Sequence, residues 1–262
     1  MLLKRSFLAT TQVSIVSLFK LGIKYDKLLV ASGGTPRRPF VPGIDLGRVY
    51  TLRSGADQAQ IKAAIPDAQR VVVVGASFIG METASSIKMK FPDKQVTVVD
   101  MSDVPFKHVL GAEVGVQMKA LFEKEGVDFV LGQGLQGIEG SAERNASAVK
   151  LTDGRSIDAD LVIVGAGIQC ATQFASGVVD MQKDGSIECS PFLRTSDENI
   201  FAAGDVCSYP DWVSGERVRT EHWSHALQQG TTAAFNMLGK VLHSLNMTPL
   251  EPAIRVGAVF LD

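Results

Sequence analysis

The sequence predicts an α/β protein built mainly on parallel strands, and three features of the chain support this. Short apolar runs recur along it, most of them ending at glycine and several followed by a helical pattern. Two of these runs, Val71–Val74 and Leu161–Val164, are continuously apolar, as strands buried on both faces of a parallel sheet are. The 25 glycines cluster between the apolar runs, where tight turns join strands to helices.

The elements expected along the chain alternate between strand and helix. The expected strands are Tyr25–Ala31, Val71–Val74, Gln95–Val99, Val127–Val130, Leu161–Val164 and Ile200–Ala203. Helical patterns extend from Gly80 to about Lys90 and over Glu113–Glu125 and His225–Leu238, the last two ending at glycine. Asp153-Gly154, between two short β-patterns, predicts a hairpin, and Thr35–Pro42 is expected to be a proline-rich turn.

Composition excludes several classes of function. Apolar residues make up 45% and charged residues 21% of the 262 positions, as in ordinary soluble globular proteins. The net charge of -2 argues against nucleic-acid binding, because such binders must neutralise a row of phosphates. Cys170, Cys189 and Cys207 show no close spacing, so neither a disulfide framework, a redox dithiol nor a zinc site is predicted. We expect three thiols in a reducing compartment.

The N-terminal segment does not decide the cellular compartment of the protein. The first 25 residues contain no Asp or Glu but several Lys, Arg, Ser and Thr, a composition that resembles a mitochondrial transit peptide. The run Ser6–Leu21 is too interrupted by polar residues to predict a membrane span. The alternative is that Phe7–Ile23 forms β-structure leading into the next strand. Localisation therefore stays undecided between cytoplasmic and mitochondrial.

A dinucleotide-binding motif follows the first buried strand. Gly75-Ala76-Ser77-Phe78-Ile79-Gly80 comes directly after Val71–Val74 and opens a helix, the context in which this motif binds a pyrophosphate. Gly75 permits the tight turn, and Gly80 lets helix and strand approach closely. Ser77 replaces the usual middle glycine and offers a hydroxyl that can itself bond a phosphate. The amide donors and partial positive charge of the helix N-terminus favour the anion.

An acidic residue closes the next strand. Asp100 lies where a carboxylate accepts hydrogen bonds from both ribose hydroxyls and repels a 2′-phosphate, which favours NAD over NADP. Glu82, two residues into the helix after Gly80, indicates by itself only a favourable carboxylate near a helix N-terminus. His222 and His225 stand three residues apart, but no carboxylate or thiolate completes a recognisable site with them. We therefore expect surface or cofactor-adjacent packing for both histidines, and no metal.

Several separated segments resemble one family. Tyr25–Arg37, Val71–Ala84 and Asn199–Val206 resemble the FAD-dependent pyridine nucleotide-disulfide oxidoreductases, flavoproteins with two dinucleotide-binding domains. Arg219–Gly230 and Ala233–Gly239 narrow the resemblance to the apoptosis-inducing factor 3-like branch, which is similar to ferredoxin and rubredoxin reductases. The similarity covers residues from about 25 to 245 in the same order.

The resemblance implies a Rossmann-like NAD-binding domain inserted in an incomplete FAD-binding domain. Nothing before Tyr25 matches the family's first glycine motif for the FAD pyrophosphate, and its C-terminal interface domain is not matched beyond about Asn246, so truncation at both ends is expected. The expected parts are an N-terminal segment (1–24), the first part of a partial FAD domain (25–55), the NAD-binding domain (56–185), the second part of the FAD domain (186–245) and a remnant of the interface domain (246–262).

The resemblance also implies roles for single residues, without assigning a catalytic one. The positions expected near FAD are Ala31, Ser32, Gly33, Gly34, Arg37, Gly204, Asp205 and Trp223. The positions expected near NAD are Gly75, Ser77, Phe78, Ile79, Gly80, Glu82, Asp100, Gly165 and Ala166. Asp205 matches the acid that hydrogen-bonds the ribityl chain of FAD. Trp223 matches an aromatic residue near the isoalloxazine ring, and Glu82 matches a carboxylate close to the nicotinamide. Without the resemblance, we would expect Asp205 to be a turn residue and Trp223 to be a core residue.

The expected function is that of an NADH-dependent FAD oxidoreductase. It passes hydride from NADH to flavin and electrons on to an unidentified acceptor, with an iron–sulfur protein or a quinone as the options. The alternative is a truncated, non-catalytic NAD-binding protein or fragment that does not hold FAD, because many of the family's FAD contacts are not matched. An incomplete flavin domain is also expected to expose apolar surface, on which a partner chain could pack.

Overall fold

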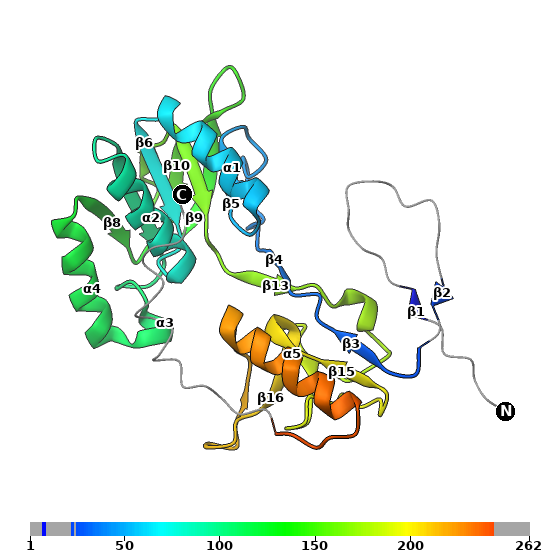
Figure 1. Ribbon diagram of the computed structural model, residues 1–262. Coiled ribbons are helices and arrows are strands. Elements are labelled where there is room, and N and C mark those ends of the chain that lie inside the picture. Colours follow the sequence, from blue (N-terminus) through cyan, green and yellow to red (C-terminus); the bar gives the residue numbers. More distant parts are fainter. Residues whose placement is uncertain (1–6, 9–21, 24, 244–262) are drawn as a thin grey trace. The chain divides into compact units, whose positions relative to one another are not determined.

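The computed structural model describes Phe7–Leu8, Gly22–Ile23 and residues 25–243. The expected remnant 246–262 lies outside the described residues, as does most of the segment 1–24, of which β1 (Phe7–Leu8) and β2 (Gly22–Ile23) form an antiparallel pair. The chain divides into two compact units (Figure 1). Of the described residues, those up to residue 35 and residues 169–243 belong to unit 1, and residues 36–168 belong to unit 2.

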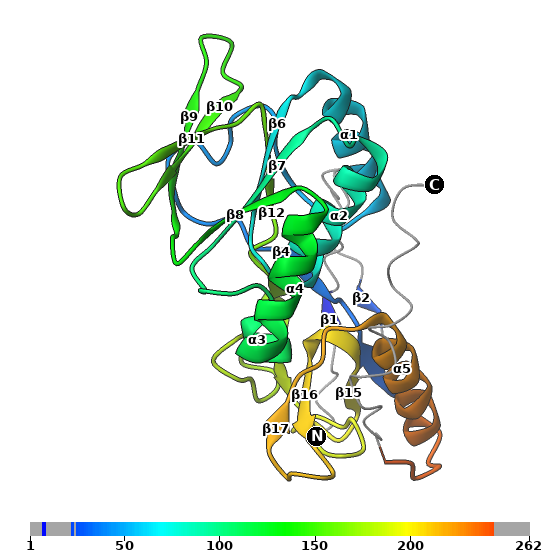
Figure 2. The ribbon, with the colours of Figure 1, turned by 90° about the vertical axis from the view of Figure 1, so that its left-hand side faces the viewer.

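Unit 2 is built on a five-stranded parallel sheet. Its strands are, in spatial order, β5 (Val49–Thr51), β12 (Leu161–Val164), β6 (Arg70–Val74), β7 (Gln95–Asp100) and β8 (Val127–Leu131). Figure 2 shows helices α1 (Gly55–Ala64), α2 (Phe78–Lys90) and α4 (Ala112–Lys124) on one side of this sheet. The other side carries an antiparallel sheet of β9 (Leu135–Gly140), β10 (Ala146–Leu151) and β11 (Ser156–Asp158). The predicted parallel α/β architecture is thus confirmed.

The two faces of the parallel sheet bury different side chains, because successive residues of a strand point to opposite sides. Val71 and Val73 belong to the core formed with α1 and α2, whereas Val72 and Val74 belong to the core beneath β9 and β10. All four side chains are buried. This two-sided burial explains why the sequence is continuously apolar there instead of alternating.

A polar contact joins the beginnings of two neighbouring strands in the sheet. Asp160, just before β12, accepts hydrogen bonds from the backbone N–H of Gln69 at 3.0 Å and of Arg70 at 2.8 Å. It also accepts from Arg70 Nη2 at 2.7 Å. The Arg70 guanidinium and these amides lower the pKa of Asp160 to about 2. The carboxylate therefore fixes the register of β12 against β6 at the end where both strands begin.

Replacing Asp160 by asparagine is expected to lower the free energy of unfolding at pH 7 by about 1–2 kcal/mol, after allowance for solvent screening of the partly exposed Arg70. The folded pKa lies below the unfolded one, so this stability is present above the unfolded pKa and is lost as pH falls toward 2. Urea denaturation of wild type and Asp160→Asn at pH 7 and pH 3 measures both effects. The control is Asp158→Asn, since Asp158 also pairs with Arg70 but its side chain is 73% exposed. Equal losses of unfolding free energy in the two variants would contradict the role of Asp160 in holding β12 against β6.

Unit 1 contains short strands and one long helix. β3 (Leu28–Val30) pairs in parallel with β15 (Ile200–Ala202). β16 (Cys207–Pro210) pairs in parallel with β14 (Ile187–Glu188) and antiparallel with β17 (Arg217–Val218). α5 (Trp223–Met237) packs against η3, a 3₁₀ turn at Gly204–Val206. The 3₁₀ turn η2 (Gln173–Ala175) also lies in unit 1, whereas α3 (Lys107–Leu110) and the 3₁₀ turn η1 (Ile65–Asp67) lie in unit 2. The division between the units falls inside β4 (Gly34–Pro36) and β13 (Ile168–Cys170).

Most expected elements are present, with shifted ends. The strand expected at Tyr25–Ala31 is shorter in the structure, Leu28–Val30, and the expected turn Thr35–Pro42 begins inside β4. The helix expected at His225–Leu238 starts two residues earlier, because His222 is its N-cap and accepts a hydrogen bond from the Ser224 amide. The hairpin at Asp153-Gly154 is confirmed, with Gly154 at φ 87° between β10 and β11.

The two units divide at other positions than the expected 55/56 and 185/186. Residues 36–55 belong to unit 2, because β5 pairs with β12 and because Gly43 and Leu46 lie against β9. Residues 169–185 belong to unit 1, because Cys170 and Ala175 are part of its core. Among the helices that the structure describes, none has the length and apolar character needed to cross a bilayer.

Candidate functional site

Three glycines make close backbone contacts at the carboxyl end of β6. Gly75 has a φ of 111°, and a Cβ there would lie 2.3 Å from the carbonyl oxygen of Gly165. A Cβ on Gly80 would lie 1.9 Å from the carbonyl oxygen of Gly75. The backbone of Gly165 bonds to the end of the same strand, its N–H donating to Val74 O at 2.7 Å. The structure thus brings Gly75, Gly80 and Gly165 together, and a side chain at Gly75 or Gly80 would clash with neighbouring backbone.

Asp100 lies beside this loop at the end of β7. Its Oδ2 accepts from the Ala76 N–H at 2.7 Å, and its Oδ1 accepts from the Ser102 N–H at 2.7 Å. Each carboxylate oxygen can accept a second hydrogen bond, so the group is held in position and retains acceptor capacity. Asp100 is also only half-buried. This arrangement suits recognition of a pair of hydroxyl groups.

The beginning of α2 is open to an anion. Ser77 is the N-cap of the helix, and its hydroxyl makes no capping hydrogen bond. Ser77 and Phe78 are exposed, while Ile79 is half-buried. The unpaired amides of a helix N-terminus carry a partial positive charge that stabilises a phosphate. Ala166, after β12, is exposed as well.

Glu82 lies farther along α2. Burial raises the pKa of its carboxyl above the ordinary value. The sequence alone indicated only a favourable helix-dipole carboxylate, but the desolvation of this group makes the charged form costly. A half-buried acid with a raised pKa, on the helix that the glycine loop opens, is a candidate functional residue.

Replacing Glu82 by glutamine is expected to stabilise unit 2 at pH 8 and to leave it unchanged at pH 4. The folded pKa is raised, so stability is complete below the unfolded pKa and is lost as pH rises through the folded pKa, where a buried charge must form. Glutamine removes that charge at similar volume. Thermal melts at the two pH values measure the effect, with Glu143→Gln as the exposed control. A Glu82→Gln variant that melts below wild type at pH 8 would contradict the interpretation.

In unit 1 the expected flavin-side residues lie at one sheet edge. Ala31–Gly34 follow β3, whereas Gly204 and Asp205 follow β15, and the two strands are parallel neighbours. Their ends are joined by a hydrogen bond from Ala203 N–H to Val30 O at 3.0 Å. Gly204 has a φ of 75°, a left-handed conformation that favours glycine, and Asp205 follows it in η3. Glycine-rich backbone and a carboxylate thus share the carboxyl edge, where open α/β sheets bind ligands.

Two polar residues of α5 are buried in unit 1, and of these His225 was a candidate from the sequence whereas Gln229 was missed. Gln229 is 1% exposed, and its Oε1 accepts from the Gly204 N–H at 2.8 Å. His225 is 4% exposed, and its Nε2 lies 2.9 Å from the hydroxyl of Tyr209. Burial is the main cause that lowers the pKa of His225. The four-residue spacing of His225 and Gln229 on one helix face was the only available signal.

The remaining expected positions lie as follows. Trp223 is the first residue of α5 and is 68% exposed, so it is not a core residue. Arg37, which belongs to unit 2, donates from Nε to Ile168 O at 2.8 Å. His222 Nδ1 contacts the Ser224 hydroxyl at 2.8 Å, so the two histidines, for which surface or cofactor-adjacent packing was expected, have separate protein partners.

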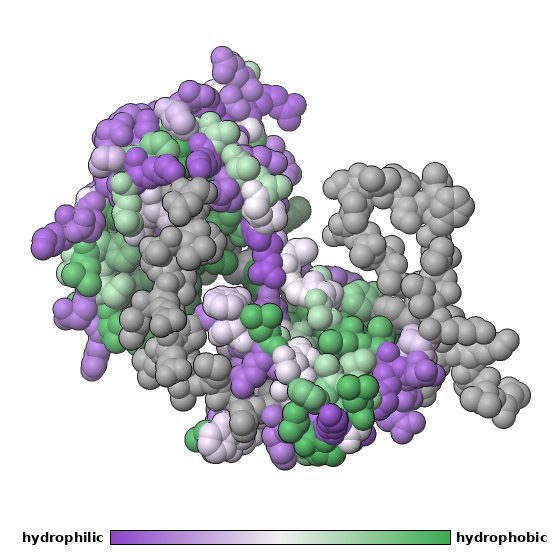
Figure 3. Space-filling view, in the orientation of Figure 1, coloured by the Kyte–Doolittle hydropathy of each residue, from purple (hydrophilic) through white to green (hydrophobic). Residues whose placement is uncertain are grey.

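Unit 1 exposes apolar side chains on and beyond α5. Figure 3 shows hydrophobic side chains gathered in this region. The exposed residues of the helix and of the segment after it are Trp223, Leu227, Phe235, Leu238, Val241 and Leu242. Unit 1 thus has exposed apolar side chains along α5 and after it, and that such a surface marks missing strands of a flavin domain stays a prediction.

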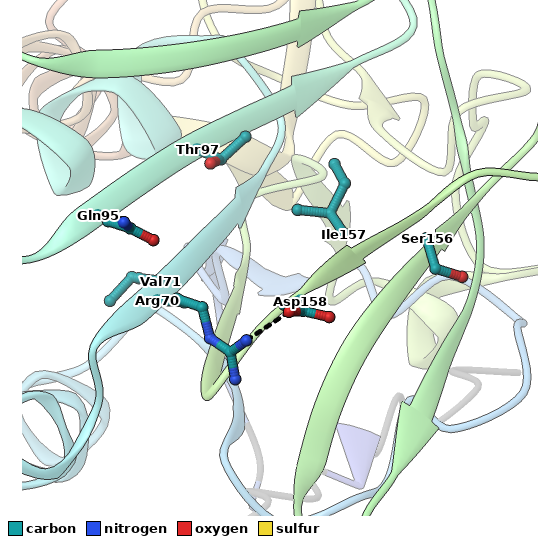
Figure 4. Close-up of a pocket in the computed structure, with 7 residues that line it drawn as sticks. All are labelled: Arg70, Val71, Gln95, Thr97, Ser156, Ile157 and Asp158. Atoms are coloured by element: carbon teal, nitrogen blue, oxygen red, sulfur yellow. Dashed lines mark hydrogen bonds and ion pairs between the residues drawn. The ribbon is translucent and has the colours of Figure 1, made fainter.

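A shallow cavity of about 380 Å³ lies elsewhere in unit 2 (Figure 4). Arg70, Gln95 and Thr97 line it from the first halves of β6 and β7, and Asp158 lines it from β11. Its arginine is already paired with Asp158 and Asp160. The cavity therefore lies at the opposite end of the strands from the glycine loop and offers little to a dinucleotide.

Comparison with known proteins agrees with this geometry. Residues 9–230 match the family model of the pyridine nucleotide-disulphide oxidoreductases. Human apoptosis-inducing factor 3 is 34% identical over 227 residues, which cover 85% of this chain and 37% of that protein. A ferredoxin reductase from Rhodopseudomonas palustris has a TM-score of 0.81 at 27% identity, over 86% of this chain and 55% of that chain. A water-forming NADH oxidase from Lactobacillus brevis, bound to NADH, also has a TM-score of 0.81, at 26% identity.

The chain matches only part of the length of these related proteins. The oxidase match covers 88% of this chain and 50% of the other. The chain thus spans between about a third and about a half of the proteins it resembles. The expected family resemblance is confirmed.

Proposed function

Because the chain belongs to the pyridine nucleotide-disulphide oxidoreductase family, we propose that it binds NADH in unit 2 and acts as an NADH-dependent flavoprotein oxidoreductase. Proteins of this family contain FAD and use NAD(H) or NADPH. The observation that carries the proposal is the packed loop of Gly75, Gly80 and Gly165 beside the oriented carboxylate of Asp100.

The roles proposed in unit 2 rest on its geometry and, for the nicotinamide half, on the family resemblance. The amides at the start of α2 and the Ser77 hydroxyl bind the pyrophosphate. Asp100 accepts from the hydroxyls of the adenosine ribose and disfavours a 2′-phosphate, so NADH is preferred. Gly165 and Ala166 border the nicotinamide half, and the Glu82 carboxyl lies close to the nicotinamide.

The described residues of unit 1 fit the flavin end of FAD. Ala31–Gly34 and Gly204 allow close backbone approach, Asp205 supplies a carboxylate, and Trp223 exposes an indole at the start of α5. When bound, FAD accepts hydride from NADH and delivers electrons to an acceptor. We propose that Asp205 holds the ribityl chain, that Trp223 lies along the ring and that Arg37 lies near the cofactor.

The acceptor is proposed to be an iron–sulfur protein. Among the proteins that the chain resembles is the ferredoxin reductase from Rhodopseudomonas palustris. The apolar surface of α5 is where a further protein segment of the flavin domain, or a partner chain, would pack.

A visible absorption spectrum, recorded before and after anaerobic addition of FAD and then NADH, tests the proposal. A flavin band that stays with the protein through gel filtration and bleaches with NADH supports oxidoreductase activity of this polypeptide. NADH binding without retained flavin would assign to this polypeptide only the NADH site, the alternative considered from the sequence. Failure to bind NADH would overturn the proposal.

A further inference from the structure

The backbone of Ala76, inside the glycine loop, is held at both of its polar atoms. Its N–H donates to Asp100 Oδ2 at 2.7 Å, and its carbonyl accepts from the Phe106 N–H at 2.8 Å. Both partners come from the segment 100–106 that leaves β7. This segment therefore fixes two successive peptide planes of the loop.

The orientation of each plane follows from these bonds. In a trans peptide the carbonyl and the N–H point in opposite directions, and the described chain contains no cis peptide. With the Ala76 N–H directed at Asp100, the Gly75 carbonyl faces the other way, toward Gly80, as its contact distance shows. With the Ala76 carbonyl directed at Phe106, the Ser77 N–H points away from the segment. The direction of the Ser77 N–H is thus set by the hydrogen bond from Phe106.

Phe106 adopts a backbone conformation that aromatic residues avoid. Its φ of 57° and ψ of 11° lie in the left-handed region. Strained residues of this kind persist where surrounding contacts hold them, and they cluster at ligand sites. Phe106 is 6% exposed in the unit 2 core, and its ring meets the ring of Phe78 edge-on, with centroids 5.3 Å apart. Phe78 is the first residue of α2, so the ring also contacts the start of that helix.

The segment is supported from behind by α4. Val104 and Pro105 are buried, and a Cβ on Gly115 would lie 2.5 Å from Pro105 O and 2.7 Å from Val104 Cγ2. The glycine in α4 thus allows the segment to approach closely. Held between α4 and the glycine loop, Phe106 has little room to move.

We infer that Phe106 is a positioning residue for the dinucleotide pyrophosphate, acting through the Ala76–Ser77 peptide. The inference rests on the proposed NADH function of unit 2. It separates two parts of the site: the adenosine end depends on Asp100, whereas the orientation of the pyrophosphate donors depends on Phe106.

The test compares wild type, Phe106→Ala and Ile61→Ala, at a temperature where circular dichroism shows all three folded. Ile61, in α1, is a buried member of the same core and serves as the control for general loss of packing. Affinities for NADH, ADP-ribose and adenosine are measured by ligand-observed NMR. Amide hydrogen exchange of residues 75–78 is measured without ligand.

Phe106→Ala is expected to lower the affinity for NADH and ADP-ribose by about tenfold or more, and the affinity for adenosine by less than about twofold. Amide hydrogen exchange at residues 75–78 is expected to be faster. Ile61→Ala is expected to show neither selectivity nor faster local exchange. An equal loss of affinity for all three ligands in Phe106→Ala, or the same selective loss of affinity in both variants, would overturn the inference. If wild type binds no NADH, the proposed function fails, and unchanged exchange in Phe106→Ala would overturn the positioning role separately.

Discussion

Replacing Gly75 by alanine is expected to abolish detectable NADH binding. The φ of 111° is open to glycine and strained for alanine, and the new Cβ would lie 2.3 Å from the carbonyl oxygen of Gly165. Strain and overpacking together are expected to lower the free energy of unfolding of unit 2 by about 2–5 kcal/mol. Misplacing the loop by about 1 Å costs on the order of 100-fold in a site that depends on orientation. Fluorescence titration with NADH, alongside urea denaturation, measures both effects.

Two further glycine variants give the prediction its control. A Cβ on Gly165 would lie 3.3 Å from the Gly80 N, so Gly165→Ala requires only a small shift and is expected to cause an intermediate loss. A Cβ on Gly55, in the first turn of α1, meets nothing within 4 Å. Gly55→Ala is therefore expected to leave NADH binding unchanged and to stabilise the helix by about 0.4–1 kcal/mol. An order of effects other than Gly75, Gly165, Gly55 would contradict the geometry.

Replacing Asp100 by alanine and Met101 by arginine is expected to invert the preference between NADH and NADPH. Alanine removes the acceptor for the ribose hydroxyls and the charge that opposes a 2′-phosphate, which weakens NADH by about 10–100-fold. Met101 is 80% exposed and follows Asp100 directly, so an arginine there has room to bind the added phosphate. Competition of each nucleotide against ADP-ribose gives the two affinities.

The control for this change is Asp103→Ala. Asp103 lies in the same loop, carries the same charge and pairs with Lys107 at 2.8 Å. Its removal is expected to change the NADH to NADPH affinity ratio by less than about twofold, since exposed pairs contribute little. A similar ratio change in both variants would indicate a general charge effect and not recognition by Asp100.

The central fold was predictable because burial leaves a direct trace in the sequence. Val71–Val74 and Leu161–Val164 are apolar at every position, since each strand is covered on both faces. β5 was not predicted to belong with them, because Val49–Thr51 is too short to show a pattern and joins the sheet only through its pairing with β12. The compact units also divide at other positions than the expected domain bounds, because β5 pairs with β12 and because Cys170 and Ala175 pack in the core of unit 1.

The candidate site was predictable where its chemistry is local. Gly75, Gly80 and Asp100 lie at fixed distances in the sequence, and the structure brings them together. Phe106 and Gln229 were not predicted, because each acts through a contact with a distant segment. Such contacts have no short-range pattern.

The most direct test of the central claim is a pair of binding titrations of the wild-type chain, one with NADH and one with NADPH, at fixed salt and pH 7. A site built on the glycine loop and Asp100 predicts saturable NADH binding and NADPH binding at least about tenfold weaker. Equal affinities would contradict the role of Asp100, and no binding of either nucleotide would contradict the assignment of unit 2 as an NADH-binding unit.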